Sequence, residues 1–303
     1  MASQVYILSI DGGGLKGLIA IKILQVIEQI TGALVSEQFD LFAGTSTGGL
    51  ISCALAAARK DSGVTHNLDH IENMYLDVGQ ELFRQGGLTY NEKDAEKFNA
   101  ILKQTFHKKK ISEVYKPVFI PAYDKITKSL VVFKTRSAKQ NKQKDVSLVE
   151  ACRATTALPP VFPPFRMLYN SRELYCVDAG PLLKNPALSA LAEVWKHKGY
   201  YGNEQLRAED IVLLSISTGN YRGQKADWSA NIKDVMHSQE MDMAYIKAQR
   251  LEIPFEEIKY LRVDMNLGGS AFSLTQLLHW IERIRSLSAN ERFIYEVRSL
   301  LMS

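Results

Sequence analysis

Ser46 stands in the pentapeptide Gly44-Thr45-Ser46-Thr47-Gly48, between two apolar segments. Leu41–Ala43 predicts a short strand, and Leu50–Ala58, which is apolar almost all round, predicts a buried helix. A serine on a sharp strand-to-helix turn presents its hydroxyl outward, and flanking glycines let the turn close without clashes. G-x-S-x-G also arises by chance, so a plain glycine turn is the alternative. The strand before the motif and the helix after it favour a nucleophile.

A second glycine-rich turn, Asp11-Gly12-Gly13-Gly14-Leu15-Lys16-Gly17, follows the apolar run Val5–Ile10. The run predicts a strand that is covered on both faces. The apolar spacing after the turn predicts a helix, at Leu15, Ile19, Ile23, Val26 and Ile30. Consecutive glycines expose backbone N–H groups, and such donors suit a developing oxyanion. We therefore predict that the oxyanion hole is formed by Gly12, Gly13 and Gly14.

The same turn also has an alternative interpretation as a dinucleotide site, because Gly12, Gly14 and Gly17 satisfy G-x-G-x-x-G. That fingerprint requires an acidic residue at the end of the next strand. Asp40 comes before the next expected strand rather than after it, and that strand ends at the Ser46 turn. This order favours a hydrolase.

The third motif, Asp178-Ala179-Gly180, directly follows the expected strand Leu174–Val177. Folds with parallel sheets place their functional sites at the carboxyl ends of strands. A turn-forming aspartate before glycine is the alternative. Because the other two motifs are present, Asp178 is the best candidate for the base that activates Ser46.

Six histidines are candidates for a third catalytic residue: His66, His70, His107, His197, His237 and His279. A Ser…Asp…His chain order would admit the last three. None of the six stands in a strand-end loop, so we predict a Ser–Asp dyad without histidine. No Cys/His cluster has metal-ligand spacing, and we expect no metal and no cofactor.

Alternating strand and helix patterns predict an α/β layer fold with a mainly parallel sheet. Further strands are expected at Val118–Tyr123 and Leu130–Thr135, which form a hairpin, and at Ile211–Ser217. Gly32 is placed to end the first helix. Asn185-Pro186 is a start signal for a helix at Ala187–His197, and the chain from Ser273 onward is expected to be mostly helical.

Composition narrows the class of protein. Hydrophobic residues make up 46% of the 303 residues and the net charge is +4, which is ordinary for a globular protein and permits an anionic partner without requiring one. The three cysteines do not form a disulfide framework, so we expect a reducing compartment. No apolar stretch approaches the ~18 residues that a membrane span needs, and the apolar run Val5–Ile10 is too short for a signal peptide, so we expect neither.

A polar and basic stretch, Lys134–Lys144, interrupts the alternating strand and helix patterns. It contains Lys134, Arg136, Lys139, Lys142 and Lys144. We favour a solvated loop, and contact with anionic head groups or a nucleotide is the alternative.

The apolar, proline-rich segment Pro159–Phe165 is the second unusual stretch. Proline fixes its backbone, so Phe162 and Phe165 either pack in the core or line a groove for an acyl chain. Both readings stay open, and Met167 and Leu168 join the two phenylalanines as candidate lipid contacts.

Together, the three motifs resemble the patatin-like phospholipases. In that family, Asp-Gly-Gly-Gly-x-[Lys/Arg]-Gly forms the oxyanion hole, Gly-x-Ser-x-Gly holds the nucleophile, and Asp-Gly-[Gly/Ala] supplies the base. The resemblance extends to Ala154–Pro164, Asn185–Ala187 and Leu214–Gly219, and covers residues 5 to 220. One departure is Ala179, where the family usually has glycine.

The resemblance implies a three-layer α/β/α fold in a single domain, with a catalytic core at about 5–220 and a mainly helical part at about 221–303. It implies hydrolysis of fatty acyl esters in membrane phospholipids, of the phospholipase A type, through Ser46 and Asp178. The two rivals are a non-lipid serine esterase with the same dyad and a nucleotide-binding module.

The chain looks more like compact intracellular bacterial members than like the secreted plant storage members, and some of those bacterial members resemble effectors of anti-phage signalling that a cyclic oligonucleotide activates. It therefore implies a cytoplasmic protein that binds phospholipid membrane peripherally and reversibly, with such regulation in the part after Asn220. We expect no nucleic-acid polymer as a partner, and the sequence leaves homo-oligomerisation open.

Overall fold

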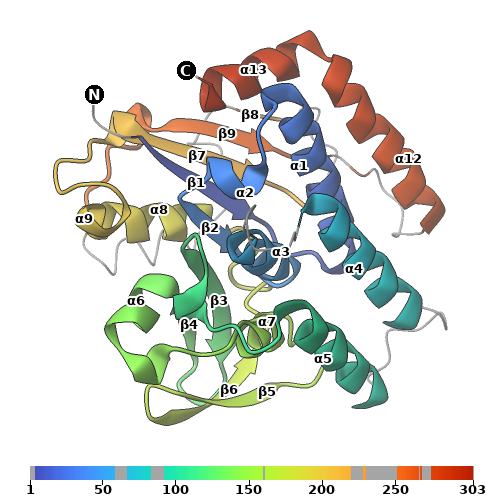
Figure 1. Cartoon of the computed structure of the whole chain (residues 1–303), viewed down its shortest axis with the longest axis vertical. Coiled ribbons are helices and arrows are strands. Elements are labelled where there is room, and N and C mark those ends of the chain that lie inside the picture. The colour runs from blue at the N-terminus through green and yellow to red at the C-terminus, as the bar shows by residue number, and fades with distance from the viewer. Residues whose placement is uncertain are drawn as a thin grey trace.

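The computed structural model describes residues 4–58, 67–82, 92–159, 161–219, 228–229, 251–265, 267 and 274–302. Within these ranges, nine strands form one sheet in the order β5-β6-β3-β2-β1-β7-β9-β8, with β4 beside β3 (Figure 1). Their bounds are β1 Val5–Ile10, β2 Leu41–Gly44, β3 Val118–Asp124, β4 Ser129–Lys134, β5 Phe165–Tyr169, β6 Arg172–Val177, β7 Ile211–Ile216, β8 Trp228–Ser229 and β9 Lys259–Val263.

The centre of the sheet is parallel. The strands β3, β2, β1, β7 and β9 run in the same direction, whereas β4, β5, β6 and β8 pair antiparallel with their neighbours. The prediction of a mainly parallel sheet is therefore confirmed, and so is the predicted hairpin, which is β3 and β4.

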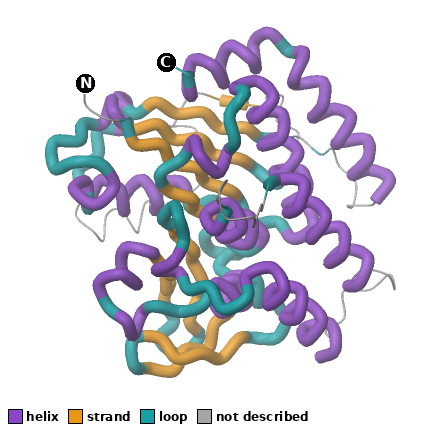
Figure 2. Tube along the Cα trace, in the orientation of Figure 1, coloured by secondary structure: helices purple, strands orange, loops and turns teal. Residues whose placement is uncertain are grey.

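Helices cover both faces of the sheet, and this confirms the three-layer α/β/α arrangement (Figures 1 and 2). The helix α8 packs on β1, β2 and β7 on one face, whereas α3 packs on β1, β2 and β3, and α1 packs on α12 and α13. The helices are α1 Gly17–Thr31, α2 Val35–Gln38, α3 Thr47–Ala57, α4 Leu68–Leu82, α5 Glu92–Phe106, α6 Thr135–Gln140, α7 Leu148–Thr155, α8 Ala187–Lys196, α9 Lys198–Tyr201, α12 Leu274–Arg285 and α13 Glu291–Leu301.

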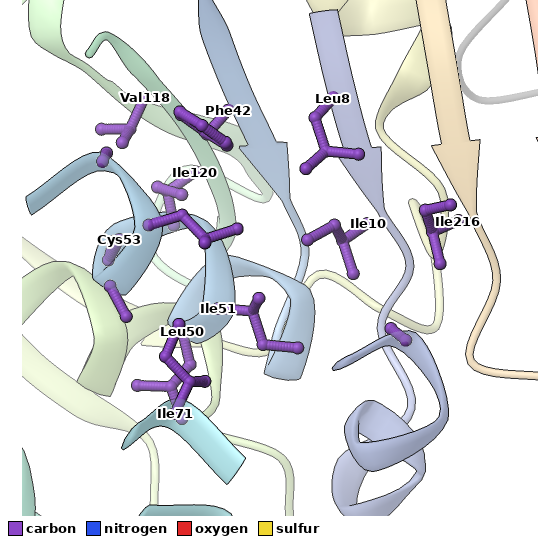
Figure 3. Packing of buried hydrophobic residues seen from close by; sticks show 14 of the residues in the cluster. Leu8, Ile10, Phe42, Leu50, Ile51, Cys53, Ile71, Val118, Ile120 and Ile216 are labelled. Atoms are coloured by element: carbon purple, nitrogen blue, oxygen red, sulfur yellow. The ribbon is translucent and has the colours of Figure 1, made fainter. Parts of the chain in front are cut away.

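Side chains of the central strands alternate between two hydrophobic clusters. Ile7 of β1 and Leu213 of β7 pack with α8, whereas Leu8 and Leu214 pack with α1 and α3 on the other face. Figure 3 shows Leu8 and Ile10 beside α3. Successive residues of a strand point to opposite faces, so a strand that is buried on both faces is apolar at nearly every position.

The ends of two helices follow local sequence signals. Gly32 adopts a left-handed conformation with a φ of 69°, and its N–H donates to the Glu28 carbonyl, which ends α1 as predicted. The Asn185 side chain accepts a hydrogen bond from the Ala187 N–H at the start of α8. This bond confirms the expected start signal for that helix.

The sheet continues beyond residue 220. The strand β9 lies parallel to β7, with Leu214 opposite Leu261, and Leu261 and Val263 are buried in the main core. The expected division between a catalytic core that ends near 220 and a helical remainder therefore does not match the sheet, although α12 and α13 agree with a helical end of the chain.

The cysteines Cys53, Cys152 and Cys176 are all buried and unbridged. Among the described residues, no helix has both the length and the apolar character to cross a membrane.

The two-sided burial of β7 gives a test of the layer arrangement. Leu213→Ala and Leu214→Ala should each lower the free energy of unfolding by about 2–5 kcal/mol, because each leaves a cavity in a different cluster. Ile126→Ala, at a residue that is 56% exposed, is the control and should cost less than about 0.5 kcal/mol. Chemical denaturation measures all three. A cost at only one of the two leucines would contradict a sheet that is covered on both faces.

Candidate active site

The Ser46 turn lies between β2 and α3 and is tightly closed. Ser46 has a φ of 54° and a ψ of −121°, which is a strained conformation for a residue with a side chain. A Cβ on Gly44 would lie 2.1 Å from the Gly48 carbonyl oxygen, and one on Gly48 would lie 2.2 Å from the Ile10 carbonyl oxygen. Both glycines are therefore required for the turn to close, as the sequence predicts.

The order of pairing along β3 brings the Ser46 turn to Asp178. One edge of β3 is paired with β4 from Phe119 to Asp124, so β2 and β6 have to share its other edge. The strand β2 pairs there at residues 118–119 and β6 pairs at residues 123–124, in the opposite direction. The carboxyl ends of β2 and β6 consequently point at each other across a short gap.

Thr155, from the end of α7, fills part of this gap. Its Oγ1 accepts a hydrogen bond from the Ser46 N–H at 2.8 Å and donates to the Pro121 carbonyl at 2.6 Å. Thr155 therefore ties the Ser46 turn to the stretch of β3 that lies between the residues paired with β2 and those paired with β6. The sequence indicated no such role, because Thr155 and Ser46 lie 109 positions apart.

Ser46 and Asp178 are in direct contact. The Ser46 Oγ donates to the Asp178 Oδ2 at 2.5 Å, and the two residues are 8% and 5% exposed. The main chain holds the carboxylate in place, since the Asp178 N–H donates to the Ala157 carbonyl and the Gly180 N–H donates to Oδ1 at 2.6 Å. Serine and aspartate thus meet without an intervening histidine.

Burial raises the pKa of Asp178 to about 6, against the opposing effect of the hydrogen bonds from Ser46 and Gly180. A carboxylate with a pKa near neutrality is a better proton acceptor than one near 4, and it is still largely ionised at pH 7. The site therefore contains a hydroxyl and a base that is suited to activate it.

The glycine loop requires one correction. The Gly12 N–H donates to the Lys184 carbonyl at 2.8 Å, so it does not serve as the oxyanion donor that the sequence predicts. Gly13 and Gly14 begin the short 3₁₀ helix Gly14–Lys16, and N–H groups in the first turn of a helix have no acceptor within that helix. Gly13 is half-buried and Gly14 is exposed, which leaves these two amides as the candidates.

Residues in β9 and just after β7 hold the glycine loop in place. The Thr218 hydroxyl donates to the Gly12 carbonyl at 2.7 Å, and a Cβ on Gly13 would lie 2.2 Å from the Thr218 Oγ1. Asp11 forms a two-bond ion pair with Arg262 of β9. Thr218 lies in the segment Leu214–Gly219, to which the resemblance extends without assigning it a role, and Arg262 lies in no motif, so the sequence predicted neither contact.

The two phenylalanines of the proline-rich segment are half-buried. Phe162 stacks on Phe98 with ring centroids 4.8 Å apart, and both Phe162 and Phe165 pack against the main core. The Arg153 guanidinium lies 5.5 Å from each of their ring centroids. These contacts favour a packing role, and the role of Phe162 and Phe165 in binding an acyl chain stays a prediction.

The other two expected lipid contacts lie on β5. Met167 is buried, whereas Leu168 is 69% exposed. Leu168 pairs with Glu173 in the neighbouring strand β6, which places it roughly 16 Å along that strand from Asp178, at about 3.3 Å per residue. Leu168 is therefore remote from the dyad.

The basic stretch is more ordered than a solvated loop. Lys134 and Arg136 form ion pairs of 2.8 Å and 2.7 Å with the buried Glu193 of α8, so the preferred interpretation is wrong for these two residues. Lys139 and Lys142 are exposed and Lys144 is half-buried.

Of the histidines, His197 ends α8 and lies 3.9 Å from Glu193, which agrees with a helix-end role. His66, His237 and the side chain of His279 lie outside the described residues. Within the described ranges, no group of three or more His, Cys, Asp or Glu side chains is placed to hold a metal ion.

Comparison with known proteins identifies the family. The model of the family "Patatin-like phospholipase" matches residues 8–191, more than half of the chain. The chain therefore belongs to the patatin-like phospholipase family.

Relatives of similar identity include one whose name carries the words "Probable inactive". The chain is 29% identical to "Patatin-like protein 2" of Arabidopsis thaliana, over 76% of this chain and 63% of that protein. It is 26% identical to "Patatin-T5" of Solanum tuberosum, over 72% of this chain and 61% of that protein. It is also 29% identical to "Probable inactive patatin-like protein 9" of Arabidopsis thaliana, over 70% of this chain and 60% of that protein. The aligned regions span less than two thirds of each relative's length.

Among solved structures, the chain is similar to VipD from Legionella pneumophila, with a TM-score of 0.49 and 13% identity over 98% of this chain and 67% of that chain.

The raised pKa of Asp178 predicts the pH dependence of catalysis. Below about pH 6 the carboxyl group is protonated and cannot accept the Ser46 proton, so kcat/KM should fall about tenfold per pH unit there and reach a plateau above pH 7. The measurement is kcat/KM for a soluble nitrophenyl ester from pH 4.5 to 8.5, with circular dichroism to verify folding at each pH. A midpoint near 4, or no dependence on pH, would contradict the assignment of Asp178 as a buried base.

Proposed function

We propose that the chain is a lipid acyl hydrolase in which Ser46 is the nucleophile and Asp178 is its base. The observation that carries this proposal is the 2.5 Å hydrogen bond between the two side chains at the meeting point of β2 and β6. A nucleophile needs a base within hydrogen-bond reach, and the strained Ser46 turn supports a chemical rather than a packing role.

The proposed reaction proceeds in two halves. Asp178 takes the proton of Ser46 as Oγ attacks the ester carbonyl, and the oxyanion accepts hydrogen bonds from the amides of Gly13 and Gly14. The tetrahedral intermediate expels the alcohol, which receives the proton from Asp178, and leaves an acyl ester on Ser46. Asp178 then takes a proton from water as the water oxygen attacks the acyl carbonyl, and it returns that proton to the Ser46 Oγ when the C–Oγ bond breaks and the fatty acid is released.

The substrate we propose is the fatty acyl ester of a membrane phospholipid, cleaved in the manner of a phospholipase A. Family membership supports a lipid ester. A non-lipid serine esterase with the same dyad is the alternative. The nucleotide-binding alternative is disfavoured because Asp40 precedes β2 and accepts hydrogen bonds from Tyr6 and Lys116, while β2 ends at the Ser46 turn.

Peripheral binding to the bilayer is supported by two exposed leucines beside the dyad. Leu158 is 38% exposed and directly follows Ala157, whose carbonyl binds the Asp178 N–H. Leu182 is 41% exposed, and its N–H donates to the Ala179 carbonyl in the turn after Asp178. We name Leu158 and Leu182 the leucine rim and propose that it enters the lipid surface when substrate binds.

Activation by a cyclic oligonucleotide and a cytoplasmic location remain predictions. The region in which we expect such regulation is described only in part, because residues 220–227 and 230–250 lie outside the described residues. Contact of the exposed Lys139 and Lys142 with anionic head groups is likewise a prediction, and vesicle sedimentation of charge-reversed variants tests it.

The dyad is tested by mass spectrometry of lipid products from phospholipid vesicles. Ser46→Ala and Asp178→Asn should each lower fatty acid release by at least about 10³-fold, since each removes one member of the nucleophile–base pair. Ser52→Ala, which removes another buried serine on α3, is the matched control and should retain activity. Retained release of fatty acid in either dyad variant would refute the mechanism, and hydrolysis of soluble esters alone would favour the non-lipid esterase.

The leucine rim is tested by comparing two substrates. Leu158→Ser and Leu182→Ser should each weaken vesicle binding on the order of tenfold, because each removes a side chain whose burial in lipid contributes about 1.5–3 kcal/mol. Hydrolysis of a soluble nitrophenyl ester should stay unchanged. Leu34→Ser is the control, because Leu34 is also 38% exposed but lies between α1 and α2, before the amino end of β2, whereas the dyad follows the carboxyl ends of β2 and β6. Equal effects at all three leucines would rule out a specific rim.

A further inference from the structure

A buried ion pair joins the glycine loop to the last parallel strand of the sheet. Arg262 of β9 donates to Asp11 Oδ1 at 2.8 Å and to Oδ2 at 2.7 Å, and it also donates to the Ser215 hydroxyl of β7 at 2.7 Å. The side chains of Arg262 and Asp11 are 13% and 2% exposed. A planar guanidinium that binds both oxygens of a carboxylate fixes its orientation as well as its position.

The geometry of the sheet explains how this contact forms. Arg262 lies opposite Ser215, and Ser215 lies opposite Ser9 of β1, in one row across three strands. Side chains alternate along a strand, so Arg262 lies on the same face as Tyr260, which packs in the α8 cluster. Arg262 therefore reaches across β7, beneath α8, to the residue that follows the end of β1.

Asp11 is the first residue of the loop that carries the candidate oxyanion donors. Its N–H donates to the Ile216 carbonyl at 3.0 Å, so backbone and side chain are both fixed to the β7–β9 side. The next residue, Gly12, is held by Lys184 and Thr218. Both carboxylate oxygens of Asp11 are engaged by Arg262, which gives Asp11 an anchoring role rather than that of a second base.

We propose that Arg262 is a positioning residue that, through Asp11, sets the place of the Gly13 and Gly14 amides relative to Ser46. The proposal rests on the proposed function for its catalytic consequence. Arg262 lies outside the residues 8–191 that match the family model, so the C-terminal part of the chain contributes to the geometry of the site. A displacement of about 1 Å at such a site lowers the rate on the order of 10²-fold.

The test uses the whole chain with two variants. Arg262→Lys keeps the positive charge but loses the two-bond geometry. Asp11→Asn combined with Arg262→Gln removes both charges, so no unpaired charge is left buried. Arg166→Gln is the matched control, because it removes an arginine from an ion pair with Glu173 in which both side chains are exposed. Circular dichroism at the assay temperature selects the variants that are folded.

The first readout is steady-state hydrolysis of a soluble nitrophenyl ester. In the double variant, kcat should fall about 10- to 100-fold with KM within twofold, and Arg262→Lys should recover part of the loss. The pH midpoint near 6 that belongs to Asp178 should not move. A merely structural pair would lower the melting temperature and leave kcat unchanged, and that result in a folded variant would overturn the proposal.

The second readout is hydrogen–deuterium exchange, which does not depend on activity. The peptide that covers Gly12–Lys16 should exchange faster in both Arg262 variants, while peptides from α8 should be unchanged. Unaltered exchange in the loop would overturn the anchoring role. A wild-type chain without esterase activity would remove the proposed function and the catalytic consequence of Arg262, while exchange would still decide whether Arg262 holds the loop.

Discussion

The hydrogen bond between Ser46 and Asp178 depends on an unusual use of one strand edge. The strands β2 and β6 meet end to end along β3, so two residues 132 positions apart come together at their carboxyl ends. Thr155 closes the remaining gap through the Pro121 carbonyl. The proposed nucleophile and base are therefore placed by strand pairing rather than by long, mobile side chains, which is how a site obtains preorganised geometry.

Burial then determines the chemistry of this pair. The same apolar surroundings that exclude water from Asp178 raise its pKa to about 6, and the amide of Gly180 and the hydroxyl of Ser46 are the partners that keep the carboxylate oriented. The glycine loop divides its functions in a similar way. Asp11 and Gly12 are held by hydrogen bonds from Arg262 and to the Ile216 and Lys184 carbonyls, whereas Gly13 and Gly14 begin a 3₁₀ helix. Anchoring and the proposed binding of the transition state thus fall on successive residues of one loop.

Local signals in the sequence were sufficient to predict the layers and to select Ser46 and Asp178, whose side chains the fold brings into contact. Val5–Ile10 is apolar at every position but one because both faces of β1 are covered, and the two glycines around Ser46 are required by close backbone contacts. The strand β9 was missed because it is short and carries charges at Lys259 and Arg262. Its arginine faces inward only because Asp11, 251 positions away, receives it.

Contacts between distant segments explain the remaining differences. Gly12 lost its expected role to the Lys184 carbonyl, and the basic stretch became ordered because Glu193 is buried beside it. Neither partner could be assigned from spacing, since a single sequence gives no pairing between segments that far apart. A reactive residue type and a turn can be recognised from the local sequence. The partner of a hydrogen-bond donor or of a charged group depends on the tertiary fold.

The central claim is that Asp178 activates Ser46 for covalent chemistry, and labelling with a fluorophosphonate tests it most directly. Intact-mass and peptide analysis should find one adduct per chain, on Ser46, and Asp178→Asn should slow its formation by at least about 100-fold, because a serine without its base is a weak nucleophile. An adduct on another residue, or an equal labelling rate in the folded Asp178→Asn chain, would contradict the account.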